Sequence, residues 1–327
     1  DPADHARRPG PAPDRDLRRG ARRRARREYP RGAARSRAMR SVLLSACAAI
    51  AGCAPPAAPA APPPARAPIS FTYLGVAGWQ IEAAGKVVLA DPYLSRPKLD
   101  EPIAPDLAAI AAHTPARADL VIVGHSHVDH LLDAPAVALR TGAQLLGSLS
   151  TTRVGRASGV PADHLITVGG GEDYELGGYS LRVLPSLHSA IDDKHAVPGV
   201  IAADPHLPMR MADYQDGGTL AYLLRLAGHE VVIFDTANFI ERELTGLRPD
   251  IAIIAPGLRE HIHDYTCRLL HALGDPPTVL ATHFDAWTGP PVDEPPSADL
   301  QAFVDEVRRC APRTRLILPR HFARIDL

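Results

Sequence analysis

Gly124-His125-Ser126-His127-Val128-Asp129-His130 is the stretch that decides the fold, and it directly follows the short apolar run 119–123. Such a run, ending at a glycine, is typical of a buried strand. In an extended backbone residues i and i+2 project to the same side, so His125 and His127 can bind one cation. A turn after them would bring Asp129 and His130 to a second cation. Neutral imidazole and carboxylate groups suit Zn²⁺, and also Mn²⁺ or Fe²⁺.

Three more ligand-capable side chains stand at the ends of predicted strands. His188 follows the run 183–187, Asp235 ends the run 231–234, and His283 follows the run 279–282. Loops at strand ends commonly present functional groups from a rigid scaffold. As a series after the His-rich stretch, these three residues complete a predicted site for two divalent ions.

From residue 69 onwards, a strand-rich half with few helices occurs twice. This arrangement predicts an α/β fold in which two sheets pack face to face with helices outside. The predicted strands are 69–75, 79–83, 86–90, 119–123, 144–146, 164–168, 179–187, 219–226, 230–235, 251–255, 278–282 and 315–318. The predicted helices are 103–112, 134–140, 264–273 and 298–309.

The order of these residues resembles the five-part pattern of the metallo-β-lactamase superfamily over about residues 69–327. Asp91, in Ala90-Asp91-Pro92, is similar to the first motif and 125–130 to the second. His188, Asp235 and His283 are similar to the third, fourth and fifth. The resemblance implies a four-layer αββα sandwich with the metals in a cleft at the sheet edges.

The same resemblance implies a role for each residue. His125, His127 and His188 would bind the first metal. Asp129, His130 and His283 would bind the second, and Asp235 would bridge both. Asp91 would orient a ligand. Apart from this resemblance, we expect His321, in Pro319-Arg320-His321-Phe322, to reach the site from the C-terminus and contact substrate or a ligand. Phe234 stands where the family often has glycine, and we expect its bulk to affect a metal position.

The implied activity is that of a metal-dependent hydrolase. Asp129 would orient the attacking water and accept its proton. The segments 71–79 and 91–95 look most like the branch with ascorbate-lactonase-like and N-acyl-phosphatidylethanolamine phospholipase D-like enzymes. We therefore expect an ester, lactone or phosphodiester substrate, either a small molecule or a lipid.

Two alternatives stay open. One is a phospholipase D-like phosphodiesterase acting on membrane lipids, because Ile201, Leu207, Met209 and Met211 would suit an acyl chain. The other is a metal-binding lipoprotein that keeps the fold without catalysis.

The N-terminal part predicts export and a lipid anchor. Residues 39–53 have a short positive start, an apolar stretch and Ile50-Ala51-Gly52-Cys53, which resembles the lipobox of bacterial lipoproteins. Residues 54–68 are a tether of Ala and Pro with one Arg. We expect a lipidated Cys53 to hold the protein at the periplasmic face of a bacterial membrane, and Ala54 after it favours the outer membrane.

The segment 1–38 differs from the rest. It carries thirteen Arg and a formal charge of +8, with almost no large apolar residues. It is either a basic arm or upstream sequence that is not translated, and the complete export signal after Met39 favours the second interpretation.

Charge and cysteine content narrow the function further. Residues 41–327 carry 22 basic and 32 acidic side chains, a formal charge of −10. This charge argues against nonspecific nucleic-acid binding. Cys267 and Cys310 could pair in an oxidising compartment, and neither belongs to a CxxC pair that would favour a thiolate zinc site.

Overall fold

The computed structural model describes residues 66–99, 102–191, 194–195 and 197–327. The predicted Arg-rich segment, the predicted signal with Cys53, and the tether up to residue 65 lie outside the described residues. The first described residues join the sandwich at once, because the Ala67 N–H donates to the Ala227 carbonyl.

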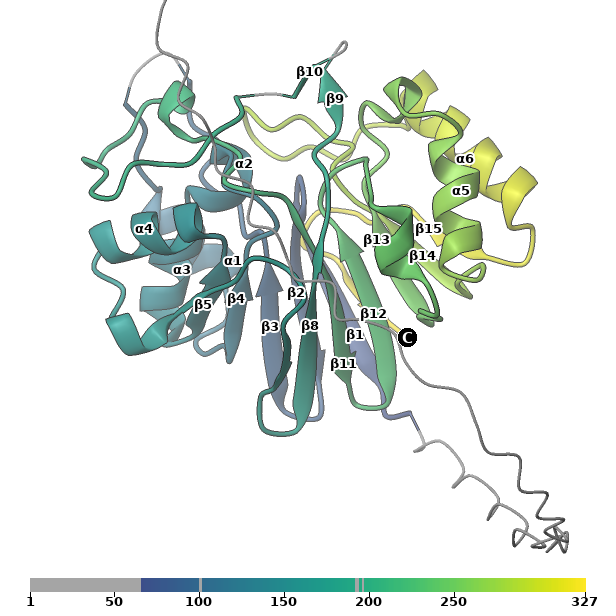
Figure 1. The fold of residues 1–327 in the computed structure, drawn as a ribbon, viewed down its shortest axis with the longest axis horizontal. Coiled ribbons are helices and arrows are strands. Elements are labelled where there is room, and N and C mark those ends of the chain that lie inside the picture. The colour runs from purple at the N-terminus through teal and green to yellow at the C-terminus, as the bar shows by residue number, and fades with distance from the viewer. Residues whose placement is uncertain (1–65, 100–101, 192–193, 196) are drawn as a thin grey trace, which may run out of the picture. The chain divides into compact units, whose positions relative to one another are not determined.

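Two seven-stranded sheets form the centre of the described domain (Figure 1). In order across the first sheet, the strands are β16 (Arg324–Asp326), β1 (Ile69–Gly75), β2 (Gly78–Ala83), β3 (Lys86–Ala90), β4 (Leu120–Ile122), β5 (Gln144–Gly147) and β6 (Leu165–Thr167). Across the second sheet they are β15 (Arg315–Ile317), β14 (Thr278–Ala281), β13 (Ile251–Ile254), β12 (His229–Phe234), β11 (Leu220–Leu226), β8 (Tyr179–Pro185) and β7 (Asp173–Glu175). A small separate hairpin pairs β9 (Ala190–Ile191) with β10 (Lys194–His195).

The inner strands carry apolar side chains on both faces, because each sheet packs against the other sheet on one face and against helices on the other. In β12, Val231 and Ile233 pack between the two sheets, whereas Val232 and Phe234 pack towards the outer helices. Alternate residues of a strand point to opposite faces, so both sets must be apolar when both faces are buried.

Helices cover the outer faces of both sheets (Figure 1). In the described residues of the N-terminal half, the helices are α1 (Leu107–His113), α2 (Val128–Leu131), α3 (Ala134–Thr141) and α4 (Leu149–Ala157). The second sheet is covered by α5 (Tyr265–Ala272) and α6 (Ala298–Cys310). Short 3₁₀ turns are η1 (Ala162–His164), η2 (Met211–Asp213), η3 (Glu241–Leu244) and η4 (Arg259–His261). The predicted αββα sandwich is confirmed.

One predicted helix starts too early. The range 103–112 was wrong at its beginning, because Ile103 pairs with Met209 in an isolated bridge and α1 begins only at Leu107. Pro105 disfavours helical geometry in the residue before it. Asp106 then caps the helix, and its side chain accepts hydrogen bonds from the N–H groups of Ala108 and Ala109 at 2.9 and 3.1 Å.

The second half contains a disulfide between its two helices. Cys267 of α5 and Cys310 of α6 are bonded, with a Cα–Cα distance of 5.1 Å. None of the helices in the described part of the chain combines the length and the apolar character that crossing a membrane requires.

Candidate metal centre

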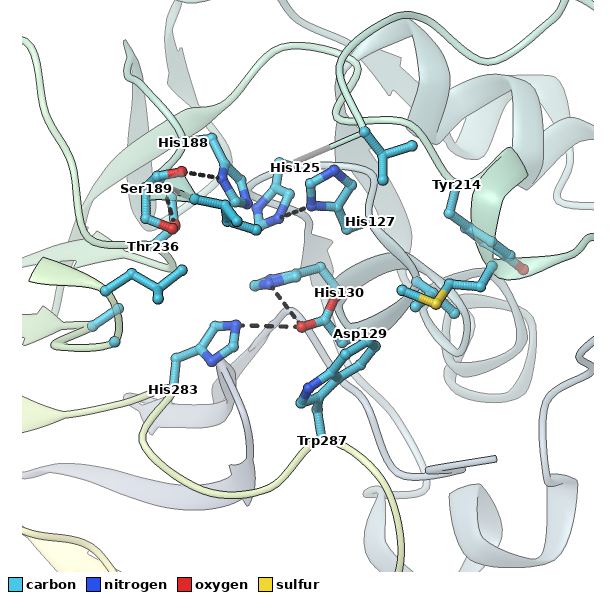
Figure 2. Close-up of a pocket in the computed structure, with 17 residues that line it drawn as sticks. His125, His127, Asp129, His130, His188, Ser189, Tyr214, Thr236, His283 and Trp287 are labelled. Carbon is cyan, nitrogen blue, oxygen red and sulfur yellow. Dashed lines mark hydrogen bonds and ion pairs between the residues drawn. The ribbon is translucent and has the colours of Figure 1, made fainter. Parts of the chain in front are cut away.

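The seven predicted ligands meet where strands of the two sheets end. Strands β3, β4 and β5 run parallel, as do β12, β13 and β14, so within each set the carboxyl ends lie at one edge. The loop after β4, residues 124–130, is called the β4 loop below. The loop after β14, residues 282–287, is called the β14 loop. Figure 2 shows their imidazole and carboxylate groups converging on one space together with His188.

The ligand-capable atoms form three groups, and within each group all of them lie within 4.8 Å of one another. The groups are His125 with His127 and His188, then Asp129 with His130 and His283, and then His125 with His130 and Asp235. The first two are the sets expected for two separate ions. The third places Asp235 between them, where a bridging carboxylate is expected.

Hydrogen bonds orient the imidazoles of the first group. His188 Nδ1 donates to the Ser189 carbonyl at 2.8 Å, which leaves its Nε2 free to bind a cation. His125 Nδ1 lies 2.6 Å from Asp235 Oδ2. Burial lowers the pKa of both His125 and His188, so both rings favour the neutral form that metal ions bind.

The second group centres on Asp129. One of its oxygens lies 3.3 Å from His283 Nε2 and 3.6 Å from His130 Nε2. Burial by itself would raise the pKa of Asp129, but the neighbouring His130 and His283 outweigh that effect and lower the pKa below its usual range. Asp129 is therefore held as a carboxylate.

Buried polar atoms that have no hydrogen-bond partner indicate whether a cation fits these groups. Among the described residues, His127 Nε2 and both ring nitrogens of His130 are buried without a hydrogen-bond partner. Leaving such an atom unpaired costs about 1–3 kcal/mol. An ion in the first group would satisfy His127 Nε2, and an ion in the second group would satisfy His130 Nε2, whereas His130 Nδ1 lies 3.5 Å from Asp91 Oδ1. The donor set of imidazoles and carboxylates is also the one that zinc-like ions prefer. The cluster is thus able to bind metal.

Asp91 and Gly124 support the cluster from behind. Asp91 accepts a hydrogen bond from the Gly124 N–H at 2.8 Å and lies 3.5 Å from His130 Nδ1, as expected for a residue that orients a ligand. Position 124 requires glycine, because a Cβ there would collide with the carboxylate of Asp235. This close approach buries Asp235, and burial raises its pKa to about 8. A neighbouring cation would stabilise the ionised form.

Phe234 does not intrude on the cluster, contrary to our expectation from its bulk. It lies on the outer face of β12 and packs in the core under the helices of the second sheet. The alternation along the strand explains this result, because Asp235 and Phe234 point to opposite sides.

His321 contacts residues next to the cluster rather than the predicted ligands themselves. Its ring nitrogens face Asp285 and Asp293, at 2.8 and 2.9 Å, and no contact with one of the seven ligand residues is observed. Asp285 belongs to the β14 loop and accepts hydrogen bonds from the Tyr73 hydroxyl and the Val76 N–H at 2.6 and 2.9 Å. His321 therefore acts on the β14 loop rather than on a ligand directly.

A cavity of about 230 Å³ opens above the cluster. Sequence reasoning missed most of the residues around it, including Ser189, Tyr214, Thr236 and Trp287 (Figure 2). Ser189 and Thr236 each directly follow a predicted ligand, and Trp287 follows His283 by four positions, so proximity in sequence was the available signal. Of the four apolar residues considered for a lipid chain, only Met211 lines this cavity, while Ile201 and Met209 are part of the core.

Comparison with known proteins finds relatives that share this fold. Residues 70–204 match the model of the β-lactamase superfamily domain. The chain is 28% identical to a UPF0173 metal-dependent hydrolase of Methanopyrus kandleri over 69% of this chain and 87% of that protein. The chain is therefore similar to metal-dependent hydrolases with the metallo-β-lactamase fold.

Other comparisons give the same resemblance. A UPF0173 metal-dependent hydrolase of Anaeromyxobacter sp. (strain K) is 35% identical over 41% of this chain, and the match spans only 49% of that relative. The metallo hydrolase Igni18 of Ignicoccus hospitalis shares the fold, with a TM-score of 0.55 and 21% identity over 80% of this chain and 99% of its own. The prediction of a metal-dependent hydrolase is confirmed in this general form, and the bond and the substrate stay predictions.

Proposed function

We propose that this protein cleaves an ester, lactone or phosphodiester bond with a water molecule activated by two divalent ions, zinc in the first instance and manganese or iron as alternatives. The observation that carries the proposal is the convergence of five imidazoles and two carboxylates into two adjacent ligand sets. His125, His127 and His188 would hold one ion, Asp129, His130 and His283 the other, and Asp235 would contact both.

The chemistry follows from these side chains. A bound divalent ion lowers the pKa of its water from 15.7 towards about 7, which supplies a nucleophile at neutral pH. Asp129 is kept ionised by its histidine neighbours, so its carboxylate can orient the attacking water and accept its proton. The apolar side of the cavity limits the access of bulk water.

Metal analysis followed by a substrate panel tests this proposal. The purified protein is loaded with zinc, manganese or iron, its metal content is measured, and it is assayed with p-nitrophenyl acetate, an aliphatic lactone and bis(p-nitrophenyl) phosphate. Metal-dependent hydrolysis of at least one compound is expected. Preference for the phosphodiester, and hydrolysis of phospholipid vesicles, would favour the phospholipase D-like alternative.

Asp129→Ala tests the proposed proton acceptor. Turnover should vanish in metal-replete protein, whereas Asp163→Ala, at an exposed aspartate of η1, should leave it unchanged. Near-normal turnover of Asp129→Ala at full metal content would remove Asp129 from the mechanism.

We also propose that a lipid on Cys53 holds the enzyme at the bacterial cell envelope, on the periplasmic face of the outer membrane. The lipobox-like sequence and the Ala/Pro tether support this proposal. When the full chain is expressed with labelled fatty acid, label should appear on the protein and disappear in Cys53→Ala. Equal labelling of the variant would exclude Cys53 as the acyl site.

A further inference from the structure

The lining of the cavity beside the metal cluster includes several apolar side chains. Four of them are Trp287, Met211, Val128 and Leu258. Figure 2 shows the indole of Trp287 next to Asp129, with His283 on the other side of that carboxylate. The indole therefore borders the place where the predicted ions would bind. An apolar surface at this position favours an apolar group close to the bond that is cleaved.

The polar groups of the cavity, other than the predicted metal ligands, are uncharged. Among the lining residues that the structure describes, none is lysine or arginine. A charged substituent that packs against these residues, away from the predicted ions, would lose its hydration without gaining an ionic partner among them. This part of the cavity therefore favours a neutral substituent.

Ser189 and Thr236 form a hydroxyl pair on the opposite side from Trp287. The Ser189 N–H donates to Thr236 Oγ1 at 3.1 Å, and the Thr236 hydroxyl donates to Ser189 Oγ at 3.0 Å. With Thr236 donating, the Ser189 hydroxyl keeps its own proton for another acceptor. Both residues line the cavity, so Ser189 can donate a hydrogen bond to a carbonyl or ether oxygen of a neutral substrate.

The volume limits the size of the group that fits. A cavity of 150 Å³ in another protein binds benzene. By proportion, the 230 Å³ here holds a group of about nine non-hydrogen atoms. A phenylacetyl or short alkanoyl group has this size, whereas the two long chains of a phospholipid exceed it.

Trp287 is also held in place before any ligand binds. Arg96 donates to the carbonyl of Ala286, the residue before it, and to Asp285 Oδ2 at 2.7 Å. The Arg96 side chain is only 4% exposed, so this anchor is itself buried. A wall fixed in advance lowers the entropy lost on binding.

We propose that the cavity selects an uncharged carboxylic ester or lactone with a small apolar or aromatic acyl group, and that Trp287 is the specificity-determining residue that packs against this group. The inference rests on the proposed hydrolase function, which it narrows to one substrate class. A charged acyl group that packs against Trp287 is disfavoured by the same apolar surface.

A series of p-nitrophenyl esters with one leaving group tests the activity of the metal-loaded enzyme. The phenylacetate should exceed the anionic hemiglutarate at least tenfold in kcat/KM. Trp287→Ala should lower kcat/KM about tenfold for the phenylacetate, mainly through KM, and less than threefold for the acetate. Leu149→Ala, at an exposed apolar residue of α4 outside the cavity, should change none of these values.

A binding measurement gives a readout that does not need turnover. The chain has two tryptophans, and Trp79 is fully buried in the core, so a change of emission on ligand binding reports Trp287. Phenylacetone, a ketone that mimics the neutral ester, should shift the emission of metal-loaded protein at least tenfold below the concentration that levulinate requires. Trp287→Phe should lose the signal but keep inhibition of ester hydrolysis by phenylacetone within threefold.

The outcomes separate the two proposals. Equal or tighter binding of levulinate, or an equal effect of Trp287→Ala on every ester, overturns the inference while the hydrolase proposal stands. Preferred hydrolysis of bis(p-nitrophenyl) phosphate also overturns the inference and keeps a metal-dependent hydrolase. If no compound is hydrolysed, the proposed function fails, and the emission titration alone still decides whether the cavity prefers a neutral aromatic group.

Discussion

The two loops that supply most of the metal centre are held in different ways. In the β4 loop, His125 and His130 are 1% and 0% exposed and lie in the core beside residues of neighbouring strands. In the β14 loop, the His283 side chain is 27% exposed, and the loop is anchored by ionic contacts to distant residues. The ligand of the β14 loop is therefore less buried than those of the β4 loop, and the contacts of Asp285 with Arg96 and His321 add to the packing of the β14 loop.

Backbone geometry supports this contrast. His283 has a φ of +51°, in the left-handed region that few residues other than glycine adopt. Such a conformation costs about 1–3 kcal/mol and persists only where surrounding contacts enforce it. Its backbone N–H donates to the Val76 carbonyl at 2.5 Å, so the first strands of the chain impose the geometry of the second half of the site.

The largest expected effect is the loss of a ligand from the β4 loop. His127→Ala leaves two imidazoles in its group, so metal affinity should fall more than about a hundredfold, beyond the 10–100-fold typical of an outer partner. Turnover should fall with it. His263→Ala, at an exposed histidine, is the control. Full metal content in His127→Ala, measured by elemental analysis after dialysis, would contradict the proposed ligand set.

The next effect concerns the anchor of the β14 loop. Arg96→Leu removes the guanidinium that pairs with the buried carboxylate of Asp285 and leaves His321 as its remaining ionic partner, which should cost about 3–5 kcal/mol of stability in denaturant unfolding. Arg308→Ala removes an exposed partner of Asp305 and should cost about 0–1 kcal/mol. If both variants unfold at the same denaturant concentration, the anchor does not fix this loop.

A smaller effect is expected behind the β4 loop. The Cβ of Gly124→Ala would displace Asp235, so metal affinity should fall about 10–100-fold, as for other changes that disturb ligand orientation. Gly169→Ala adds a Cβ with no atom within 4 Å and should change nothing. Titration with a competing metal chelator measures both, and equal affinities would show that Asp235 tolerates the displacement.

The smallest effect is expected at His321. His321→Gln keeps a hydrogen-bonding side chain but loses one contact to Asp285 or Asp293, which should change KM by about two- to tenfold, the equivalent of one hydrogen bond. Metal content should stay at the level of the unchanged protein. A loss of bound metal would instead show that His321 acts on a ligand directly, as the sequence suggested.

The sequence by itself determined the sandwich and predicted most of the side chains that the structure brings together in the cluster. The pattern of apolar runs placed β1 at residues 69–75 and the other long strands within a residue or two, because burial on both faces requires continuous apolar sequence. The β4 loop was equally accessible, since His125, His127, Asp129 and His130 are neighbours in sequence. The structure shows that these four side chains lie close together, and their roles as metal ligands stay predictions.

Other features depended on weaker local signals. Helix α4 was missed because its sequence, from Leu149 to Ala157, is rich in Ser, Thr and Arg and has no clear apolar periodicity. Its cap was readable, since Ser148 accepts a hydrogen bond from the Thr151 N–H. The edge strand β16 was missed because its three residues alternate too briefly to be recognised.

Only the tertiary structure decided how the β14 loop is held and what lines the cavity. Asp285 lies 189 positions from Arg96 and 212 from Tyr73, and no local pattern relates residues at such separations. The same holds for Trp287, which borders the predicted metal site because Arg96 fixes the residues before it. Periodicity and spacing report which residues are buried and which can bind a cation, whereas the pairing of single polar groups across the sandwich follows only from the packed fold.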